Sequence, residues 1–237
     1  MKWGSMLSHL KPLISQSLTR VYSPGSTILF QGEVPRSVGI ITRGIIRVYS
    51  ISAQGDEQII TYNVAGEFFP ASWIFGKTPG ALFFYESVSE SEIAFINRQE
   101  FLTYMTGSSE RMRALLDYFA TNYAASLIRV SALEQPKARE KLLYTLYYLC
   151  QRYGNKTPKS SSIIEIELLL THQNLASLVG LTRETTATEM NKLKREKIIN
   201  YDNQKYRINL DKLLDLLGED SFRGISINSP LSSGSSE

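Results

Sequence analysis

The chain has 237 residues, 43% of them hydrophobic, and a formal net charge of +3. This length and composition fit one or two folded cores, and we expect two domains. No apolar run approaches the roughly 20 residues of a membrane-spanning helix, no signal peptide is evident, and a single cysteine, Cys150, excludes an intramolecular disulfide. We therefore expect a protein of the reducing cytoplasm that has no membrane partner.

The N-terminal part of the chain alternates between short β-type runs and turn signals. The turns are marked by Pro24-Gly25, Gly32, Gly44, Gly55 and Gly66. Short strands at regular spacing are typical of a small closed β-barrel or roll. The expected strands cover residues 27–30, 38–41, 45–51, 57–63, 83–88 and 92–96.

Residues 109–134 have the pattern of one long helix with an apolar seam. The seam residues are separated by four and three positions, a spacing that favours a helix paired with its own copy. A single helix packed on the roll is the alternative, and Ser126 on the seam keeps it open. The other seam residues are Met112, Leu116, Phe119, Tyr123, Val130 and Leu133. All of these except Leu133 are our predicted dimer interface.

Gln135-Pro136 ends this helical pattern, so we expect a hinge at residues 134–137 and a new helix from Ala138 through Arg152. Cys150 falls on the apolar part of that helix, where we interpret it as a packed thiol. Residues 154–162 have the composition of a loop, and a strand is expected at 163–168.

Residues 170–197 have the pattern of two short helices joined by a tight turn. Thr171 can cap the first helix, whose apolar residues recur at helical spacing. Gly180 is the residue type that ends a helix in a left-handed conformation. Thr182 can cap the second helix. This is the pattern of a helix-turn-helix whose second helix enters a DNA major groove.

Arg183 and Glu184 would open that second helix with exposed side chains. Arginine suits the O6/N7 edge of guanine, and glutamate accepts from the cytosine amino group, so this pair can read sequence. Thr182, Thr188 and Lys192 are expected at phosphates. A surface helix pair in an ordinary α-helical domain is the alternative. The predicted DNA-binding residues are Thr171, His172, Gln173, Thr182, Arg183, Glu184, Thr185, Thr188 and Lys192.

Residues 198–201 and 205–208 are β-branched or aromatic runs separated by Asp-Asn-Gln, which predicts a hairpin directly after the second helix. The module is then a winged helix-turn-helix. Residues 136–210 contain 13 Lys/Arg against 7 Asp/Glu, about +6, which leaves about −3 for the remainder of the +3 chain. The basic character therefore lies on the predicted DNA-binding module.

The chain resembles the Crp/Fnr family of bacterial transcription regulators, because its expected elements follow the same order: a roll, a long helix, a hinge and a winged helix. The resemblance covers residues 10–217. Its most specific signal is the run Val179-Gly180-Leu181-Thr182-Arg183-Glu184-Thr185. In the N-terminal half it rests on Pro24-Gly25, Gln31-Gly32-Glu33, Gly44-Ile45-Ile46-Arg47-Val48 and Gly66-Glu67-Phe68.

The resemblance implies an α+β fold in three parts. Residues 10–107 would form a double-stranded β-helix or jelly-roll barrel, similar to cyclic-nucleotide-binding effector domains. Residues 108–135 would form a dimerisation helix, and residues 136–217 a winged helix-turn-helix. The Ser-rich residues 218–237 read as a disordered tail. The resemblance also implies a homodimer on a two-fold symmetric, double-stranded promoter site, with RNA polymerase as a further partner and a small effector in the roll. Nothing in the sequence indicates an enzyme.

The sequence departs from cyclic-nucleotide-binding members of this family. Those members use a Gly-Glu pair and an Arg-Ser pair where this chain has Pro70-Ala71 and Ala81-Leu82, and a hydroxyl near the position of Ala124-Ala125. A cyclic phosphate would be left unpaired in an apolar site, which is costly. We therefore predict that cyclic AMP does not bind. Thr188 also stands where many members have a second arginine, so the preferred DNA site should differ.

The sequence lacks the side chains that would bind other sensory groups, so we expect no cofactor or metal. One cysteine cannot hold an iron-sulfur cluster, and the two histidines are His9, near a mobile N-terminus, and His172, beside the DNA surface. The hypothesis that remains is an apolar or aromatic effector near Trp73, Phe84, Tyr85 and Tyr123, with ordinary core packing of these aromatics as the alternative. An effector-independent dimer, controlled by abundance or a protein partner, also remains open.

Overall fold

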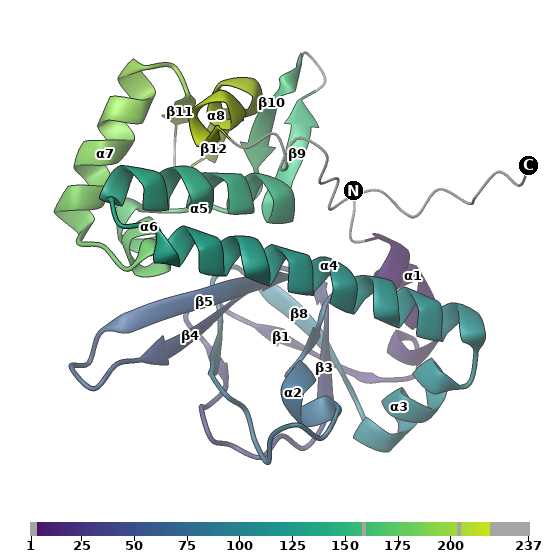
Figure 1. The fold of residues 1–237 in the computed structure, drawn as a ribbon. Helices are drawn as coiled ribbons and strands as arrows, with labels where there is room; N and C mark the ends of the chain where they lie inside the picture. The colour runs from purple at the N-terminus through teal and green to yellow at the C-terminus, as the bar shows by residue number, and fades with distance from the viewer. Residues whose placement is uncertain (1–3, 158–159, 203–204, 219–237) are drawn as a thin grey trace, which may run out of the picture. The chain divides into compact units, whose positions relative to one another are not determined.

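The computed structural model describes residues 4–157, 160–202 and 205–218. The chain divides into two compact units, Met1–Phe119 and Ala120–Glu237, and the boundary falls within helix α4 (Ser109–Glu134) (Figure 1). The predicted tail after residue 218 and the tip of the predicted hairpin lie outside the described residues. Within the described residues, no helix combines the length and apolar composition that a membrane crossing requires.

The first unit is a β-roll of two antiparallel four-stranded sheets, ordered β1-β8-β3-β6 and β2-β7-β4-β5. This arrangement follows from short strands and closely spaced turns, which close the sheet edges on each other. The strands are β1 Leu18–Tyr22, β2 Thr27–Leu29, β3 Val38–Arg43, β4 Ile45–Ile51, β5 Glu57–Val64, β6 Phe68–Phe69, β7 Phe84–Ser87 and β8 Ser91–Ile96. The helices are α1 Gly4–Ile14, α2 Ala71–Ile74 and α3 Arg98–Thr106, followed by α4.

Two apolar clusters form the core of the roll. The first joins Ala81, from the segment before β7, to inward residues of both sheets: Leu29, Ile41, Ile46, Val48, Phe69, Tyr85 and Ile93. The second joins β3, β6 and β8 to the helices, and its central ring, Phe68, contacts Phe101, Tyr118 and Phe119 with ring centroids 5.1, 4.8 and 6.2 Å away. Edge-to-face and tilted aromatic pairs at these distances add to the energy of burial.

The sequence predicted that His9 lies near a mobile N-terminus, but the structure places His9 within a helix. This helix is α1, whose Met6, Leu10 and Leu13 are buried in the second cluster. Their spacing by four and three places them on one helix face. Tyr104 of α3 donates a hydrogen bond to the backbone carbonyl of His9 at 2.9 Å, so α1 and α3 lie at the same end of the roll (Figure 1).

The second unit contains the C-terminal part of α4 and a winged helix-turn-helix. Its helix α5 contacts α6, α7, α8 and β10, and Figure 1 shows these elements around it. The sheet has the order β11-β12-β10-β9. The elements are α5 Ala138–Tyr153, β9 Gly154–Thr157, β10 Ser160–Ile166, α6 His172–Val179, α7 Arg183–Arg195, β11 Ile199–Asp202, β12 Lys205–Asn209 and α8 Leu210–Leu217.

Several predicted elements appear with little change. The bounds of α4 and β4 match the predicted 109–134 and 45–51, and β11 and β12 form the predicted hairpin. The predicted loop at 154–162 is wrong in part, because Gly154–Thr157 forms β9 and pairs with β10. Glycine and polar residues give such an edge strand little sequence signal, and its pairing partner decides its conformation.

Candidate nucleic-acid interface

Helices α6 and α7 are held by the capping residues that the sequence predicted. Thr171 Oγ1 accepts from the Asn174 backbone N–H at 3.1 Å, and Asn174 Oδ1 accepts from the Thr171 N–H at 2.9 Å, which completes a capping box. Gly180 ends α6 with a φ of 66°, a left-handed conformation that favours glycine. Thr182 accepts from the Thr185 N–H at 3.2 Å and starts α7. Each cap contributes about 1 kcal/mol.

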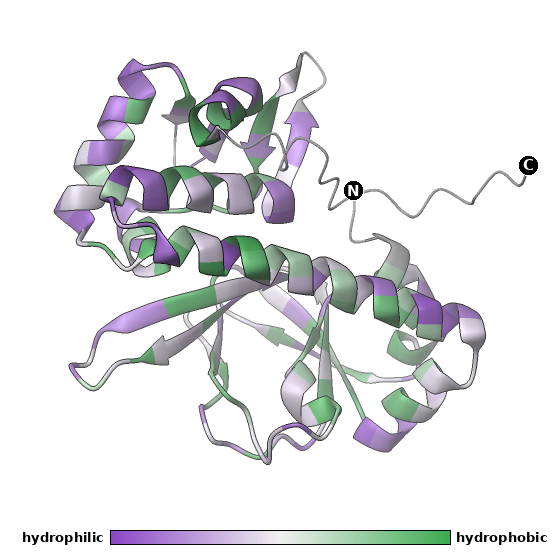
Figure 2. Ribbon diagram, viewed as in Figure 1, coloured by the Kyte–Doolittle hydropathy of each residue, from purple (hydrophilic) through white to green (hydrophobic). Residues whose placement is uncertain are grey.

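The orientation of α7 follows from its buried residues. Thr186, Met190 and Leu193 are fully buried and face the rest of the unit. The opposite stripe is exposed, and α7 is largely hydrophilic in Figure 2. Steps of four, three and four put four exposed residues on this stripe: Glu184, Thr188, Asn191 and Arg195. A recognition helix would present this stripe to a major groove.

The structure places the predicted DNA-binding residues at the start of α6 and along α7. His172 and Thr185 are half-buried, and the others are exposed. Two of the hydroxyls are engaged within the motif: Thr171 donates to Asn174 Oδ1 at 2.8 Å, and Thr182 donates to Thr185 Oγ1 at 2.9 Å. Lys192 pairs with Glu189 at 2.6 Å.

His172 lies beside this surface with a lowered pKa. Partial burial is the largest cause, and the positive charge of Arg183 is the second. Its ring makes an edge contact with the Tyr201 ring at 5.6 Å. The imidazole at the start of α6 is therefore electrostatically linked to the arginine that opens α7.

Sequence reasoning missed four residues at this surface: Asn191, Lys194, Arg195 and Tyr201. Tyr201 of β11 donates to Asn191 Oδ1 at 3.1 Å, and the Lys194 ammonium lies 4.2 Å from the centre of the Tyr201 ring. A helical-wheel projection of α7 could have identified Asn191 and Arg195. The contacts of Tyr201 could not have been found, because they join a strand to a helix.

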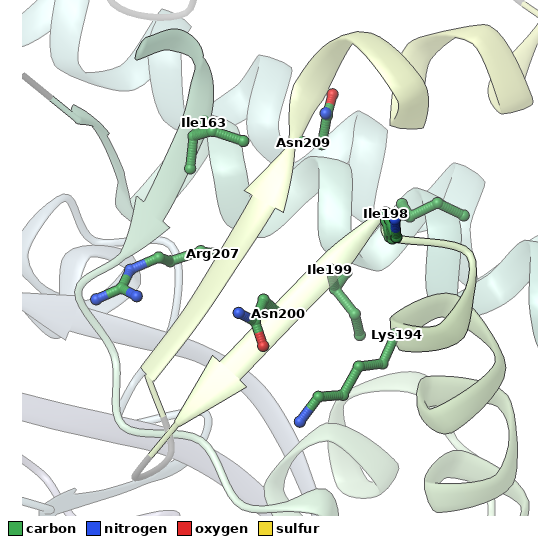
Figure 3. Close-up of a pocket in the computed structure, with 8 residues that line it drawn as sticks. Ile163, Lys194, Ile198, Ile199, Asn200, Arg207 and Asn209 are labelled. Carbon is green, nitrogen blue, oxygen red and sulfur yellow. The ribbon is translucent and has the colours of Figure 1, made fainter. Parts of the chain in front are cut away.

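A shallow groove of about 470 Å³ lies beside the wing. Figure 3 shows Lys194 reaching from α7 toward β11, and Arg207 on β12. Arg207 pairs with Glu165 of β10 at 3.1 Å. Three cations, Lys194, Lys197 and Arg207, line the groove together with Ile163, Ile198, Ile199, Asn200 and Asn209. These three cations are part of the positive charge of the second unit.

Comparisons with known proteins agree with this geometry. A family model described as a Crp-like helix-turn-helix domain matches residues 140–216, and one described as a cyclic nucleotide-binding domain matches residues 19–108. The nitrogen fixation regulation protein FixK of Rhizobium meliloti is 26% identical over 190 residues, which cover 79% of this chain and 81% of FixK. The fumarate and nitrate reduction regulatory protein of Vibrio cholerae is 25% identical, over 82% of this chain and 76% of its own length.

The order of the two matched modules along the chain decides the assignment. The chain belongs to the Crp/Fnr family of DNA-binding transcription regulators. A solved structure of a CooA variant from Carboxydothermus hydrogenoformans has the same fold, with a TM-score of 0.73 and 19% identity over 90% of this chain and 95% of CooA. The resemblance and the fold class are confirmed, and the relatives are regulators rather than enzymes, as the sequence predicted.

In this Crp/Fnr chain, the predicted dimer seam of α4 divides into two groups. Met112 and Phe119 pack against the second cluster of the roll. Leu116, Tyr123 and Val130 are exposed by 63%, 67% and 54%. Leu127 and Leu133, also exposed, extend this group, which we call the α4 stripe: Leu116, Tyr123, Leu127, Val130 and Leu133. Leu127 was not among the predicted seam residues.

The aromatics of the predicted effector pocket have separate environments. Trp73 is buried in the second cluster, with the Arg98 guanidinium 5.0 Å from its ring. Tyr85 faces the first cluster, where it stacks on Phe69 at 5.0 Å. Phe84, its neighbour on β7, lies on the opposite face and stacks on Tyr49 at 5.2 Å. Packing therefore does not support one pocket shared by these three rings. Tyr123 belongs to the second unit and to the α4 stripe.

Proposed function

We propose that this Crp/Fnr chain is a homodimer that recognises a two-fold symmetric DNA site through α7. The exposed start and stripe of α7, on a helix fixed by its cap and by three buried residues, are the observation that carries the proposal. Arg183 and Glu184 stand where they can reach base edges, because the first turns of a recognition helix lie deepest in the groove. The cations of α7 and the wing would neutralise the adjacent phosphates.

Selection of bound fragments from a random DNA pool tests this proposal. The full chain should enrich a palindrome whose half-sites are separated by about one helical turn. Arg183→Ala should relax one position in each half-site and weaken binding to the best sequence by about 1–3 kcal/mol per contact. Lys205→Ala on the wing is the control, since loss of a phosphate contact weakens all sequences alike. A uniform loss with Arg183→Ala would contradict base reading.

Dimerisation is proposed through the α4 stripe. Its exposed apolar residues recur at the spacing of a coiled-coil seam, and a second copy of the same helix matches that spacing. Val130→Glu should convert the chain to monomers in sedimentation experiments and abolish binding to the full palindrome. Asp117→Lys, a charge reversal at an exposed position of the same helix, should leave the dimer intact. A dimer that persists in Val130→Glu would place the interface elsewhere.

We propose the roll as the module through which an unidentified small effector sets DNA affinity. A second candidate, a regulator without an effector, is favoured by the Phe69–Tyr85 stack, because these rings pack on each other within the first apolar cluster of the roll. A thermal-shift screen of apolar and aromatic metabolites separates the two. A compound that raises Tm and changes DNA affinity supports gating. Compounds that leave both unchanged, across a broad panel, support the second candidate.

A further inference from the structure

Tyr201 connects the wing to the exposed stripe of α7. It lies on β11, and its hydroxyl donates to Asn191 Oδ1 at 3.1 Å across ten positions of sequence. Asn191 is exposed on the same stripe as Glu184 and Thr188. The contact therefore joins a strand of the wing to a side chain in the part of α7 that we propose faces DNA.

In the structure this hydrogen bond engages the oxygen end of the Asn191 carboxamide. A carboxamide has an acceptor oxygen and a donor NH₂ group, and rotation by about 180° exchanges them. With the oxygen held by the Tyr201 hydroxyl, the NH₂ group is the end presented outward. We infer that Tyr201 is a positioning residue that makes Asn191 a hydrogen-bond donor to DNA, an inference that rests on the proposed DNA binding.

The Tyr201 ring is itself held from three directions. The Lys194 ammonium lies over its face at 4.2 Å, and the Lys194 Nζ is 3.5 Å from the Tyr201 carbonyl oxygen. His172 of α6 contacts the ring at 5.6 Å, and Tyr206 of β12 packs at 5.2 Å. Because these contacts involve the ring and the backbone, Tyr201→Phe keeps them and removes only the hydroxyl.

A donor at Asn191 fits acceptors on DNA of two kinds. The N7 and O6 atoms of guanine and the O4 atom of thymine are acceptors on base edges, and phosphate oxygens are acceptors on the backbone. The amino groups of adenine and cytosine are donors, so the positioned carboxamide disfavours a contact with them. Asn191→Asp replaces the donor by a carboxylate, which both kinds of acceptor repel.

The test is a double-mutant cycle on DNA affinity and on the selected motif. Asn191→Ala should weaken binding to the best DNA about three- to tenfold, the value of one lost hydrogen bond, and Asn191→Asp should weaken it more. Tyr201→Phe should cause a smaller loss of about two- to fivefold. In the Asn191→Ala background, Tyr201→Phe should cause no further loss, since its hydroxyl then has nothing to position.

The selected DNA motif shows whether the acceptor is a base edge or a phosphate. The control variants show whether a loss of affinity arises from Asn191 and Tyr201 or from unfolding. A change at one base position with Asn191→Ala marks a base edge, and a uniform loss over all sequences marks a phosphate; both support a donor role. Asn155→Ala removes a carboxamide on β9, at the other edge of the sheet from β11, and should bind as the wild type does. Thermal unfolding of Tyr201→Phe should show that the protein is folded, so that the loss is one of positioning.

Two results would overturn the inference. One is wild-type affinity and motif in Asn191→Ala, and the other is a pair of losses that simply multiply in the double variant. The failure of the proposed function is distinguishable from both. If the wild-type chain selects no motif, DNA reading by α7 fails and this inference with it. If Arg183→Ala changes the motif while the Asn191 variants do not, only the inference fails.

Discussion

Arg139 and Glu196 form a two-point ion pair that joins the start of α5 to the end of α7. Arg139 Nη1 and Nη2 donate to the two carboxylate oxygens of Glu196 at 3.0 and 2.6 Å. Paired donors of this geometry fix orientation as well as distance. The C-terminal end of the proposed recognition helix is therefore attached to the central helix of its unit, while its N-terminal end is held by the Thr182 cap.

This ion pair should stabilise the fold in a pH-dependent way. The hydrogen bonds from Arg139 lower the pKa of Glu196, with smaller contributions from the charges of Arg139 and Lys192. A carboxyl whose pKa is lower in the folded state contributes stability above its unfolded pKa, about 4.3, and loses it as the pH falls through the folded value.

Because both side chains are partly exposed, we expect a coupling energy of about 0.2–1 kcal/mol at neutral pH. Urea unfolding of Arg139→Gln, Glu196→Gln and the double variant measures this coupling. The coupling should fall toward zero below pH 4, where Glu196 is protonated. A coupling that is the same at pH 3 and pH 7 would contradict an ionic interaction.

Gly39 on β3 should not tolerate a side chain. A Cβ atom there would lie 2.6 Å from Cζ of the Phe69 ring, which is buried and stacked on Tyr85. We expect Gly39→Ala to lower the free energy of unfolding by about 1–3 kcal/mol, the usual effect of overpacking. Adding Phe69→Leu should recover part of this loss, since the smaller side chain leaves room. Strictly additive losses in the two variants would show that the ring is not the obstacle.

Cys150 should be chemically inert in the folded protein. Burial raises the pKa of its thiol, and its residue is only 6% exposed. A thiol held in its protonated form is a poor nucleophile, so a thiol reagent such as Ellman's should react with it only after unfolding. Cys150→Ala should bind DNA as the wild type does, with or without oxidant. Rapid reaction of the native protein, or an oxidant effect that this variant abolishes, would indicate a redox sensor instead.

Cyclic AMP should not bind in the roll. The polypeptide at Pro70-Ala71 is the start of α2, and Ala81 is buried in the first cluster. These positions supply neither a carboxylate for the ribose nor a cation for the cyclic phosphate, whose burial unpaired is costly. Isothermal titration calorimetry at micromolar concentrations should give no saturable heat, and the DNA affinity should be unchanged by the nucleotide. Saturable binding to the full chain would contradict this prediction.

The sequence predicts the DNA-binding module better than the interior of the roll, and the reason is physical. Caps, turn glycines and helical spacing are local signals, so Thr171, Gly180 and Thr182 could be assigned correctly before the structure. The partners of Phe69, Trp73 and Tyr85 depend on which strands pair, so their separation between two clusters could not be predicted. The same holds for β9, which is a strand because β10 is beside it, and for the contact of Tyr201 with Asn191.

His172 should make DNA binding sensitive to pH. Partial burial and the charge of Arg183 lower its pKa in the free protein, so protonation favours the unfolded state and folding stability decreases slightly as the pH falls below about 6.5. DNA phosphates placed nearby would act in the opposite direction and stabilise the imidazolium. Binding should therefore be accompanied by proton uptake, and affinity should increase as the pH is lowered from about 8 to about 6.

Affinities measured across this pH range at fixed salt should distinguish His172 from other groups. His172→Gln is the appropriate variant, because it keeps a polar side chain of similar size that does not titrate. Its affinity should vary less with pH than that of the wild type. His9→Gln is the matched control, since His9 lies on α1 in the roll and should leave the pH profile unchanged. Parallel profiles for the wild type and His172→Gln would show that His172 remains neutral on DNA.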